Sequence, residues 1–236
     1  MHLERLPPVH FVTGGVYVSP ELGEGGLISA SAELQTLQPA ETAAMAGQSV
    51  IVSFTLRTLE GTIVAHNSSA AVSVAPGGTV LVDATLSAPA VTPWSAFTFS
   101  ENKTLHSPKS TYLMTVTIAP SAATDHSAAS AMDEVNVTCG FRKTAWHDKF
   151  WLNGAETQLR GFSHHDSFAG VGVAMPARVF LFHAQVNRAL GGNFWRMSHN
   201  PYDDAVYSIL DALGVMVRTP RQSALPRNTC DADMAF

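Results

Sequence analysis

Hydrophobic and polar residues alternate at every second position over much of the first 140 residues. In 50–57, apolar side chains alternate with a set that includes Ser53, Thr55 and Arg57, which is the period of a half-buried strand. Turns at Glu60-Gly61 and Gly77-Gly78 separate further expected strands. These strands are expected at 62–65, 71–74, 79–86, 112–118 and 135–139. Short strands at this spacing, with no competing helical pattern, predict a β-sandwich of immunoglobulin type.

After residue 140 the pattern changes to a hairpin followed by a segment with helical period. Asn153-Gly154 predicts a type I′ turn between strands at 150–152 and 157–159. Pro176 can open a helix that ends at 191–192. The expected apolar face of this helix consists of Val179, Phe182, Val186 and Leu190.

A strand at 193–197 follows, and then a second helix and a third strand at 215–217. Asp203 or Asp204 can cap this helix, and Gly214 ends it. Its expected apolar face consists of Val206, Ile209, Leu210 and Leu213. The order of strands and helices implies right-handed βαβ units around a parallel sheet. Arg196 and His199 therefore fall at the carboxyl end of a strand, where such sheets bind ligands.

Composition excludes several classes of function. The chain has 236 residues and a formal net charge of −5, without a basic stripe that would indicate nucleic acid. No apolar stretch is long enough to predict a membrane span, and the first residues lack the apolar core of a signal peptide. Two cysteines are too few for a disulfide scaffold. Glycosylation patterns at Asn67, Asn102 and Asn136 leave the compartment open, and the oligomeric state is equally open.

Three blocks of residues, in order, resemble glycoside hydrolase family 2, the family of β-galactosidases, β-glucuronidases and β-mannosidases. The most specific block contains Arg196, Ser198, His199, Pro201, Tyr207, Asp211 and Gly214, followed by the apolar strand 215–217. The second block consists of 150–154, 159–162 and His165, and the third of 140–142. The resemblance implies an immunoglobulin-like β-sandwich followed by the first part of a (β/α)₈ TIM barrel, which is left incomplete. It also implies a retaining β-glycosidase that cleaves a carbohydrate substrate, with a β-galactoside as the expected one.

With this resemblance, the chain is expected to have four parts. Residues 1–29 are either the end of a sugar-binding domain, because 14–18 resemble its closing strand, or a leader. Residues 30–140 form the sandwich, and 141–217 begin the TIM barrel. Residues 218–236 lack a clear period and are expected to be an aberrant, disordered tail, with disorder or aggregation expected from about residue 200.

The resemblance also assigns roles to three residues. His165 and His199 match the family's two substrate-contacting histidines, and a neutral imidazole can donate to sugar hydroxyls near pH 7. Arg196 matches a buried arginine that orders the floor of the site, since a guanidinium meets a carboxylate with two hydrogen bonds. No organic cofactor is implied. Some family members use Mg²⁺ or Na⁺, but no ligand set can be assigned in this sequence.

Other interpretations of the same residues remain open. His164-His165-Asp166 could form a metal cluster, although adjacent residues do not easily converge on one ion. Ser198-His199 could suggest a serine hydrolase, but the sequence lacks a Gly-x-Ser-x-Gly elbow. A non-catalytic carbohydrate-binding or adhesion module would use exposed aromatic residues on the sandwich. The candidates for that role are Trp94, Phe97 and Phe99.

The two carboxylates of a retaining glycosidase are missing from the expected places. The family's catalytic glutamates follow the Ser-His segment on later barrel strands, whereas the last glutamate here is Glu156. The family's strand usually continues into an acidic end, and Arg218 stands in that place. Beyond it the only acids are Asp231 and Asp233. We therefore expect this chain alone to be inactive, because neither the general acid nor the nucleophile is present.

Overall fold

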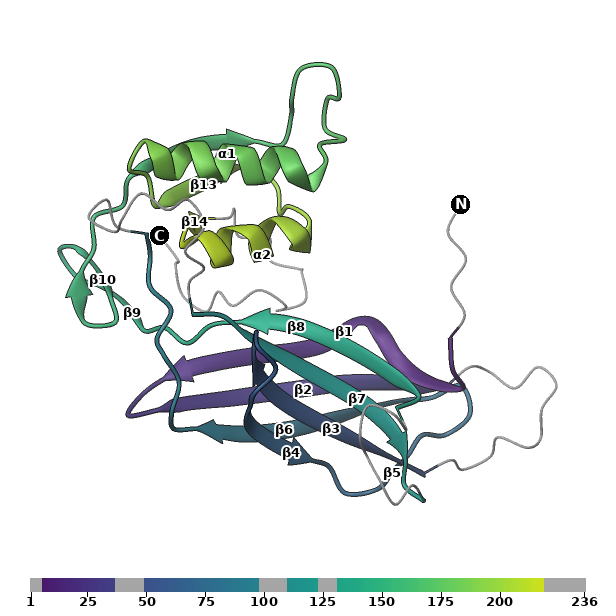
Figure 1. Cartoon of the computed structure of the whole chain (residues 1–236). Coiled ribbons are helices and arrows are strands. Elements are labelled where there is room, and N and C mark those ends of the chain that lie inside the picture. The colour runs from purple at the N-terminus through teal and green to yellow at the C-terminus, as the bar shows by residue number, and fades with distance from the viewer. Residues whose placement is uncertain (1–5, 37–48, 98–109, 123–130, 219–236) are drawn as a thin grey trace. The chain divides into compact units, whose positions relative to one another are not determined.

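The computed structural model describes residues 6–36, 49–97, 110–122 and 131–218 (Figure 1). These residues fall into two compact units. Unit 1 contains the described residues up to Val91 and those of Tyr112–Cys139, and unit 2 contains the remainder. The expected tail at 218–236 lies outside the described residues, except for Arg218.

Unit 1 contains two antiparallel sheets. The first has the order β1-β2-β6, with β1 at Val9–Leu22, β2 at Gly26–Thr36 and β6 at Thr79–Ala88. The second has the order β4-β3-β7-β8, and a short strand β5 also pairs with β3. Its strands are β3 (Ser49–Thr58), β4 (Ile63–Ser68), β5 (Val72–Ser73), β7 (Tyr112–Pro120) and β8 (Asp133–Cys139). Every strand expected between residues 50 and 139 is thus present.

Alternating side chains from both sheets supply the core of unit 1. Ile28, Ala30, Ala32 and Leu34 of β2 are buried, and the residues between them are partly or fully exposed. In β3 and β7, the two inner strands of the second sheet, burial is nearly continuous and includes the polar residues Ser53, Thr55, Thr115 and Thr117. The alternation in the sequence therefore marks the strands correctly, and the sheet position decides how far each one is buried.

The expected domain boundary at residue 29 falls inside a sheet, because the first strand β1 pairs with β2. That residue lies inside β2, and β1 pairs with β2 from Val9↔Thr36 to Leu22↔Gly26. The glycine-rich turn at 23–25 lets the two strands fold back on each other, so that their backbone groups are satisfied within one hairpin. Residues 9–22 are thus part of unit 1.

Unit 2 is built around a three-stranded parallel sheet. Its strands β12 (Gly161–His165), β13 (Phe194–Ser198) and β14 (Met216–Arg218) lie in chain order. Helix α1 (Ala177–Ala189) connects the first two strands, and α2 (Asp204–Leu213) connects the second and third. The expected strand-helix order is therefore observed. Residues 204–218 form α2 and β14, contrary to the expectation of disorder from about residue 200.

A small antiparallel sheet of three strands, called the hairpin below after its turn at Asn153-Gly154, precedes the parallel sheet. It contains β9 (Thr144–Trp146), β10 (Phe150–Leu152) and β11 (Ala155–Glu156). The two turn residues Asn153 and Gly154 have φ angles of 52° and 80°, as the predicted type I′ turn requires. Because this turn has only two residues, the returning strand begins at Ala155 and not at the expected residue 157.

Helix α2 agrees with its prediction. Asp203 is the N-cap and its side chain accepts a hydrogen bond from the Ala205 N–H at 2.9 Å. Gly214 ends the helix with a φ of 70°. Val206, Leu210 and Leu213 are buried, as expected.

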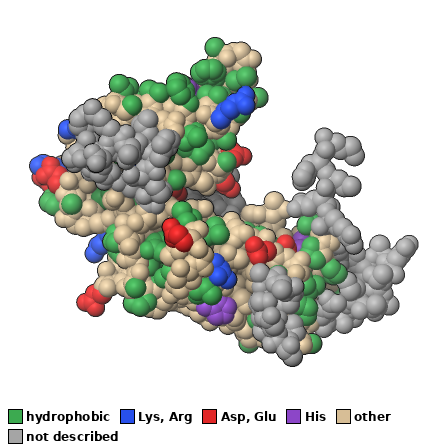
Figure 2. Space-filling model, in the orientation of Figure 1, with side chains coloured by type: hydrophobic (Ala, Val, Ile, Leu, Met, Phe, Trp, Pro, Cys, Tyr) green, Lys and Arg blue, Asp and Glu red, His purple; other side chains and the backbone are tan. Residues whose placement is uncertain are grey.

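Helix α1 buries a different face from the expected one. Phe182 is 57% exposed and Leu190 is 77% exposed. The buried residues are Phe180, Ala184, Asn187 and Arg188. Figure 2 shows hydrophobic side chains on the surface over this part of unit 2. The prediction was wrong because two stripes of α1 are partly apolar, and the small Ala184 side chain lets its stripe approach the sheet closely. Neither described helix is long and apolar enough to cross a bilayer.

Candidate functional site

The three predicted site residues lie at the carboxyl ends of two neighbouring parallel strands. His165 is the last residue of β12, Arg196 lies in β13, and His199 directly follows β13. Trp195 and Met197 point into the core that the helices share, so Arg196 lies on the opposite, exposed face of the sheet. The structure thus places these three residues at one edge of the sheet, with Arg196 exposed where the resemblance leads us to expect a buried arginine.

The two histidines are direct neighbours. Their ring centroids are 5.8 Å apart and the rings meet edge to face, with an interplanar angle of 86°. Both side chains are exposed, and the peptide bond between Ser198 and His199 is cis. Arg196 donates a hydrogen bond to Ser198 Oγ at 3.1 Å. Two imidazoles and a guanidinium are suited to donate hydrogen bonds to the hydroxyl or carboxylate groups of a sugar.

A buried polar cluster lies behind this face of the sheet, and the sequence analysis did not identify it. His164 stacks on Trp195, with centroids 4.2 Å apart and an interplanar angle of 11°. Its Nε2 is 2.9 Å from His183 Nδ1 on α1, so one of the two nitrogens donates and the other accepts. Tyr202 donates from its hydroxyl to the His164 carbonyl oxygen at 2.7 Å. The signal in the sequence was alternation, because a strand that exposes His165 must turn His164 towards the helices.

Burial sets the protonation of this cluster. Desolvation, together with the nearby His183 and His165, lowers the pKa of His164 to about 4, against a smaller opposing effect of Asp166. Burial also raises the pKa of Tyr202 to about 12. Near pH 7 the His164 imidazole is therefore neutral, and the Tyr202 hydroxyl remains a hydrogen-bond donor.

The geometry argues against the other interpretations of these residues. His164 and His165 point to opposite faces of β12 and do not converge on one ion. Within the part of the chain that the structure describes, no group of three potential ligands is placed to hold a metal. Ser198 is buried, and its hydroxyl accepts from Arg196.

The two candidates for an exposed aromatic face that the structure describes, Trp94 and Phe97, are both buried. Trp94 is 2% exposed and Phe97 is 6% exposed, and both belong to unit 2, while Phe99 lies outside the described residues. Trp94 Nε1 donates to the Asp211 carbonyl oxygen, and its ring packs in a cluster with Phe150. The aromatic residues therefore serve the core of unit 2.

The opposite ends of the parallel strands are fixed by backbone contacts. Asn193 accepts from the Arg160 N–H with Oδ1 and donates to the Gln158 carbonyl oxygen with Nδ2. A Cβ on Gly161 would overlap the carbonyl oxygen of Phe194. Gly161 of the second motif block is thus required for the close approach of β12 and β13.

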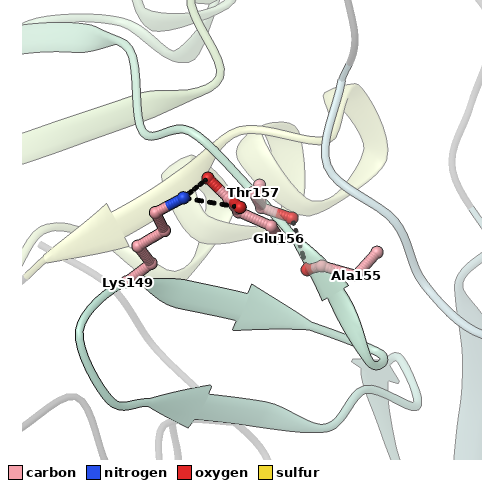
Figure 3. Close-up of polar contacts among 4 residues, drawn as sticks. All are labelled: Lys149, Ala155, Glu156 and Thr157. Atoms are coloured by element: carbon pink, nitrogen blue, oxygen red, sulfur yellow. Dashed lines mark hydrogen bonds and ion pairs between the residues drawn. The ribbon is translucent and has the colours of Figure 1, made fainter.

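Glu156, the last glutamate of the chain, is engaged in an ion pair with Lys149. Figure 3 shows its carboxylate paired with Lys149, at 2.8 and 2.9 Å from the ammonium nitrogen. Both side chains are about half exposed and lie on the β9–β11 hairpin, which precedes β12. This glutamate is part of a surface ion pair.

Comparison with known proteins agrees with the motif residues. Residues 145–221 match the family described as glycosyl hydrolases family 2, TIM barrel domain. A β-galactosidase of Thermoanaerobacterium thermosulfurigenes is 38% identical over 87 residues, which are 36% of this chain and 12% of that protein. A β-galactosidase of Thermoanaerobacter pseudethanolicus is 35% identical over 89 residues, with the same coverage. The alignments span only 8% to 12% of the length of such curated relatives.

Solved structures share the fold over most of the chain. A family 2 glycosyl hydrolase from Bacteroides cellulosilyticus has a TM-score of 0.72 and 22% identity, and the match covers 90% of this chain and 25% of that one. The Bacteroides uniformis β-glucuronidase has a TM-score of 0.71 and 20% identity, with coverage of 90% and 24%. The motif blocks and the family match thus agree that residues 145–221 are similar to the TIM barrel domain of glycoside hydrolase family 2, and the solved structures show that the chain shares the fold of such proteins.

Proposed function

We propose that the chain comes from a retaining β-glycosidase that cleaves a β-galactoside, and that it carries the part of the site that contacts the sugar. The proximity of His165 and His199 carries this proposal. They lie 5.8 Å apart on one exposed face at the carboxyl ends of neighbouring strands. Arg196 orders this face through Ser198 and is available to a carboxylate of the complete site.

We also propose that unit 1 is a sandwich of immunoglobulin type and that unit 2 is the opening of a (β/α)₈ barrel. The sheet orders β1-β2-β6 and β4-β3-β7-β8 correspond to strands A-B-E and C′-C-F-G of that type of sandwich. In this assignment β1 is strand A. In unit 2, three parallel strands with two helices match the first turns of an eight-stranded barrel.

The polypeptide of 236 residues is proposed to lack hydrolytic activity by itself. A retaining mechanism needs two carboxyl groups about 5–5.5 Å apart, one as the acid and one as the nucleophile. Glu156 is bound to Lys149 on the hairpin, and Arg218 occupies the strand end where the family usually has an acid. We therefore assign the chain roles in sugar binding and in ordering the site, with no catalytic residue among its described positions.

Two measurements on the purified chain test the proposal. First, we expect no turnover of an aryl β-galactoside, and a rate comparable to that of an intact family member would contradict the inactivity. Second, galactose should shift the NMR signals of the His165 and His199 rings in histidine-labelled protein. A few exposed hydrogen bonds of about 1 kcal/mol each imply millimolar or weaker binding. The exposed His147, on the hairpin, is the internal control and should not shift. If neither site histidine responds to galactose or to glucuronate, the assignment as a sugar site is refuted.

A further inference from the structure

Tyr202 occupies a place from which it can control the spacing of the two site histidines. It lies in the loop between β13 and α2, directly before the N-cap Asp203. Its side chain is 9% exposed, and its ring contacts the rings of Phe180 and His164, with centroids 5.7 and 5.8 Å away. The loop that carries His199 is thus anchored in the core by this one aromatic residue.

Tyr202 also joins two strands by hydrogen bonds. Its hydroxyl donates to the carbonyl oxygen of His164 at 2.7 Å, and this carbonyl belongs to the peptide unit that leads into His165. Its backbone N–H donates to the Tyr207 hydroxyl at 3.2 Å, which ties the loop to α2. A single residue therefore connects the end of β12 with the segment that follows β13.

We propose that Tyr202 is a positioning residue that holds His165 and His199 at a distance suited to one sugar ring. This inference rests on the proposed function. His165 is fixed through the peptide unit that Tyr202 binds, and His199 is fixed because it lies only three residues before Tyr202, across the conformationally restricted Pro201. The edge-to-face contact of the two imidazoles is the expected result of this anchoring.

The hydroxyl group is the part of Tyr202 that carries the effect. Burial keeps its pKa at about 12, so the hydroxyl is protonated and donates throughout the usable pH range. Replacement by phenylalanine keeps the ring packing against Phe180 and removes the contacts of the hydroxyl, which are the hydrogen bond to the His164 carbonyl oxygen and a longer contact of 3.4 Å to His164 Nδ1. Tyr202→Phe therefore separates positioning from packing.

The experiment measures the contact between the two imidazoles directly, in full-length chain with labelled histidines. Wild type should show a nuclear Overhauser contact between the His165 and His199 rings. In Tyr202→Phe this contact should be lost, and amide exchange at residues 199, 200, 202 and 203 should accelerate about tenfold, as expected for the loss of about one hydrogen bond. The melting temperature of unit 2 should fall by several degrees, and the variant should remain folded. Tyr17→Phe, which alters a half-buried tyrosine of unit 1, should leave both signals unchanged.

Each outcome separates this inference from the proposed function. If the contact persists in Tyr202→Phe at wild-type strength, Tyr202 does not position the pair, whatever the wild-type chain binds. If the contact is lost while wild type shows no response to sugar, the positioning role stands and the sugar site does not. Should Tyr202→Phe fail to fold, Tyr207→Phe removes the acceptor of the Tyr202 N–H. That variant must then weaken the contact between the rings, and an unchanged contact overturns the inference.

Discussion

Acidification tests the energetic role of the buried His164 in unit 2. This side chain is 4% exposed, stacks on Trp195 and bonds to His183, and its pKa is lowered to about 4. The charged groups around it are His183 and His165, which disfavour its protonation, and Asp166, which favours it. Protonation of His164 is therefore resisted in the folded unit and unhindered in the unfolded chain.

The sign and size of the effect follow from this difference. In the unfolded chain a histidine has a pKa of about 6.5. As the pH falls below 6.5 the unfolded state binds the proton first, so the free energy of unfolding decreases until the pH reaches the folded pKa of about 4. The stabilisation is complete above pH 6.5. Between pH 7 and pH 4.5 we expect a loss of about 2–3 kcal/mol from this group, at about 1.4 kcal/mol per pH unit.

The natural fluorescence of the protein makes this measurement specific to unit 2. All four tryptophans, at positions 94, 146, 151 and 195, belong to that unit. Urea unfolding at pH 7 and pH 4.5 would be compared between wild type and His164→Phe, which keeps an aromatic ring on Trp195 and removes the titration. The wild-type midpoint should fall by about 1–2 M more than that of the variant.

An exposed histidine of unit 2, His147, provides the matched control for the pH dependence of stability. His147→Gln changes an exposed histidine of the same unit and should leave the wild-type pH dependence intact. Carboxylates that titrate below pH 5 act equally in all three proteins and cancel in the comparison. If His164→Phe loses as much stability on acidification as wild type, the buried imidazole is not the cause and the argument fails.

Three further predictions concern the stability of the described units. Asp203→Ala should lower the free energy of unfolding of unit 2 by about 1 kcal/mol in urea, because the N-cap bond is lost, while Asp203→Asn should retain most of it. Gly161→Ala should cost about 3 kcal/mol or more, since its Cβ overlaps a backbone oxygen of β13. Gly23→Ala, whose Cβ meets only one atom at 3.9 Å, should cost less than about 1 kcal/mol, and equal losses in thermal unfolding would contradict the close strand approach. Phe180→Ser should cost about 3–5 kcal/mol, whereas Phe182→Ser should stay within about 0.5 kcal/mol; the reverse order in urea unfolding would show that α1 faces the other way.

Local signals predicted many elements because the physics that forms them is local. The turn at Asn153-Gly154 needs two residues that tolerate positive φ, and the structure has them there. Asp203 and Gly214 cap and end α2 for equally local reasons. The carboxyl-end placement of His165, Arg196 and His199 followed from the strand-helix order, since parallel strands bring their carboxyl ends to one edge of the sheet.

Contacts between distant residues escaped the sequence analysis. Trp94 appeared as a candidate surface aromatic, yet it is buried against the hairpin and bonded to Asp211 across 117 positions of the chain. Residues 9–22 appeared separable from the strands that follow them, yet the backbone of β1 is satisfied by β2. Pairings of this kind depend on which surfaces meet after collapse, and residue periodicity carries no information about that.

The sequence by itself determined where strands, turns and helix ends fall, and which residue types reach the carboxyl edge of the parallel sheet. Tertiary structure decided which stripe of α1 is buried and how His164, His183 and Tyr202 combine behind the site. The physical reason is that the periodicity of a helix or strand fixes only the directions of its side chains relative to one another. The absolute direction is chosen by the free energy of burying that element against partners far away in the chain.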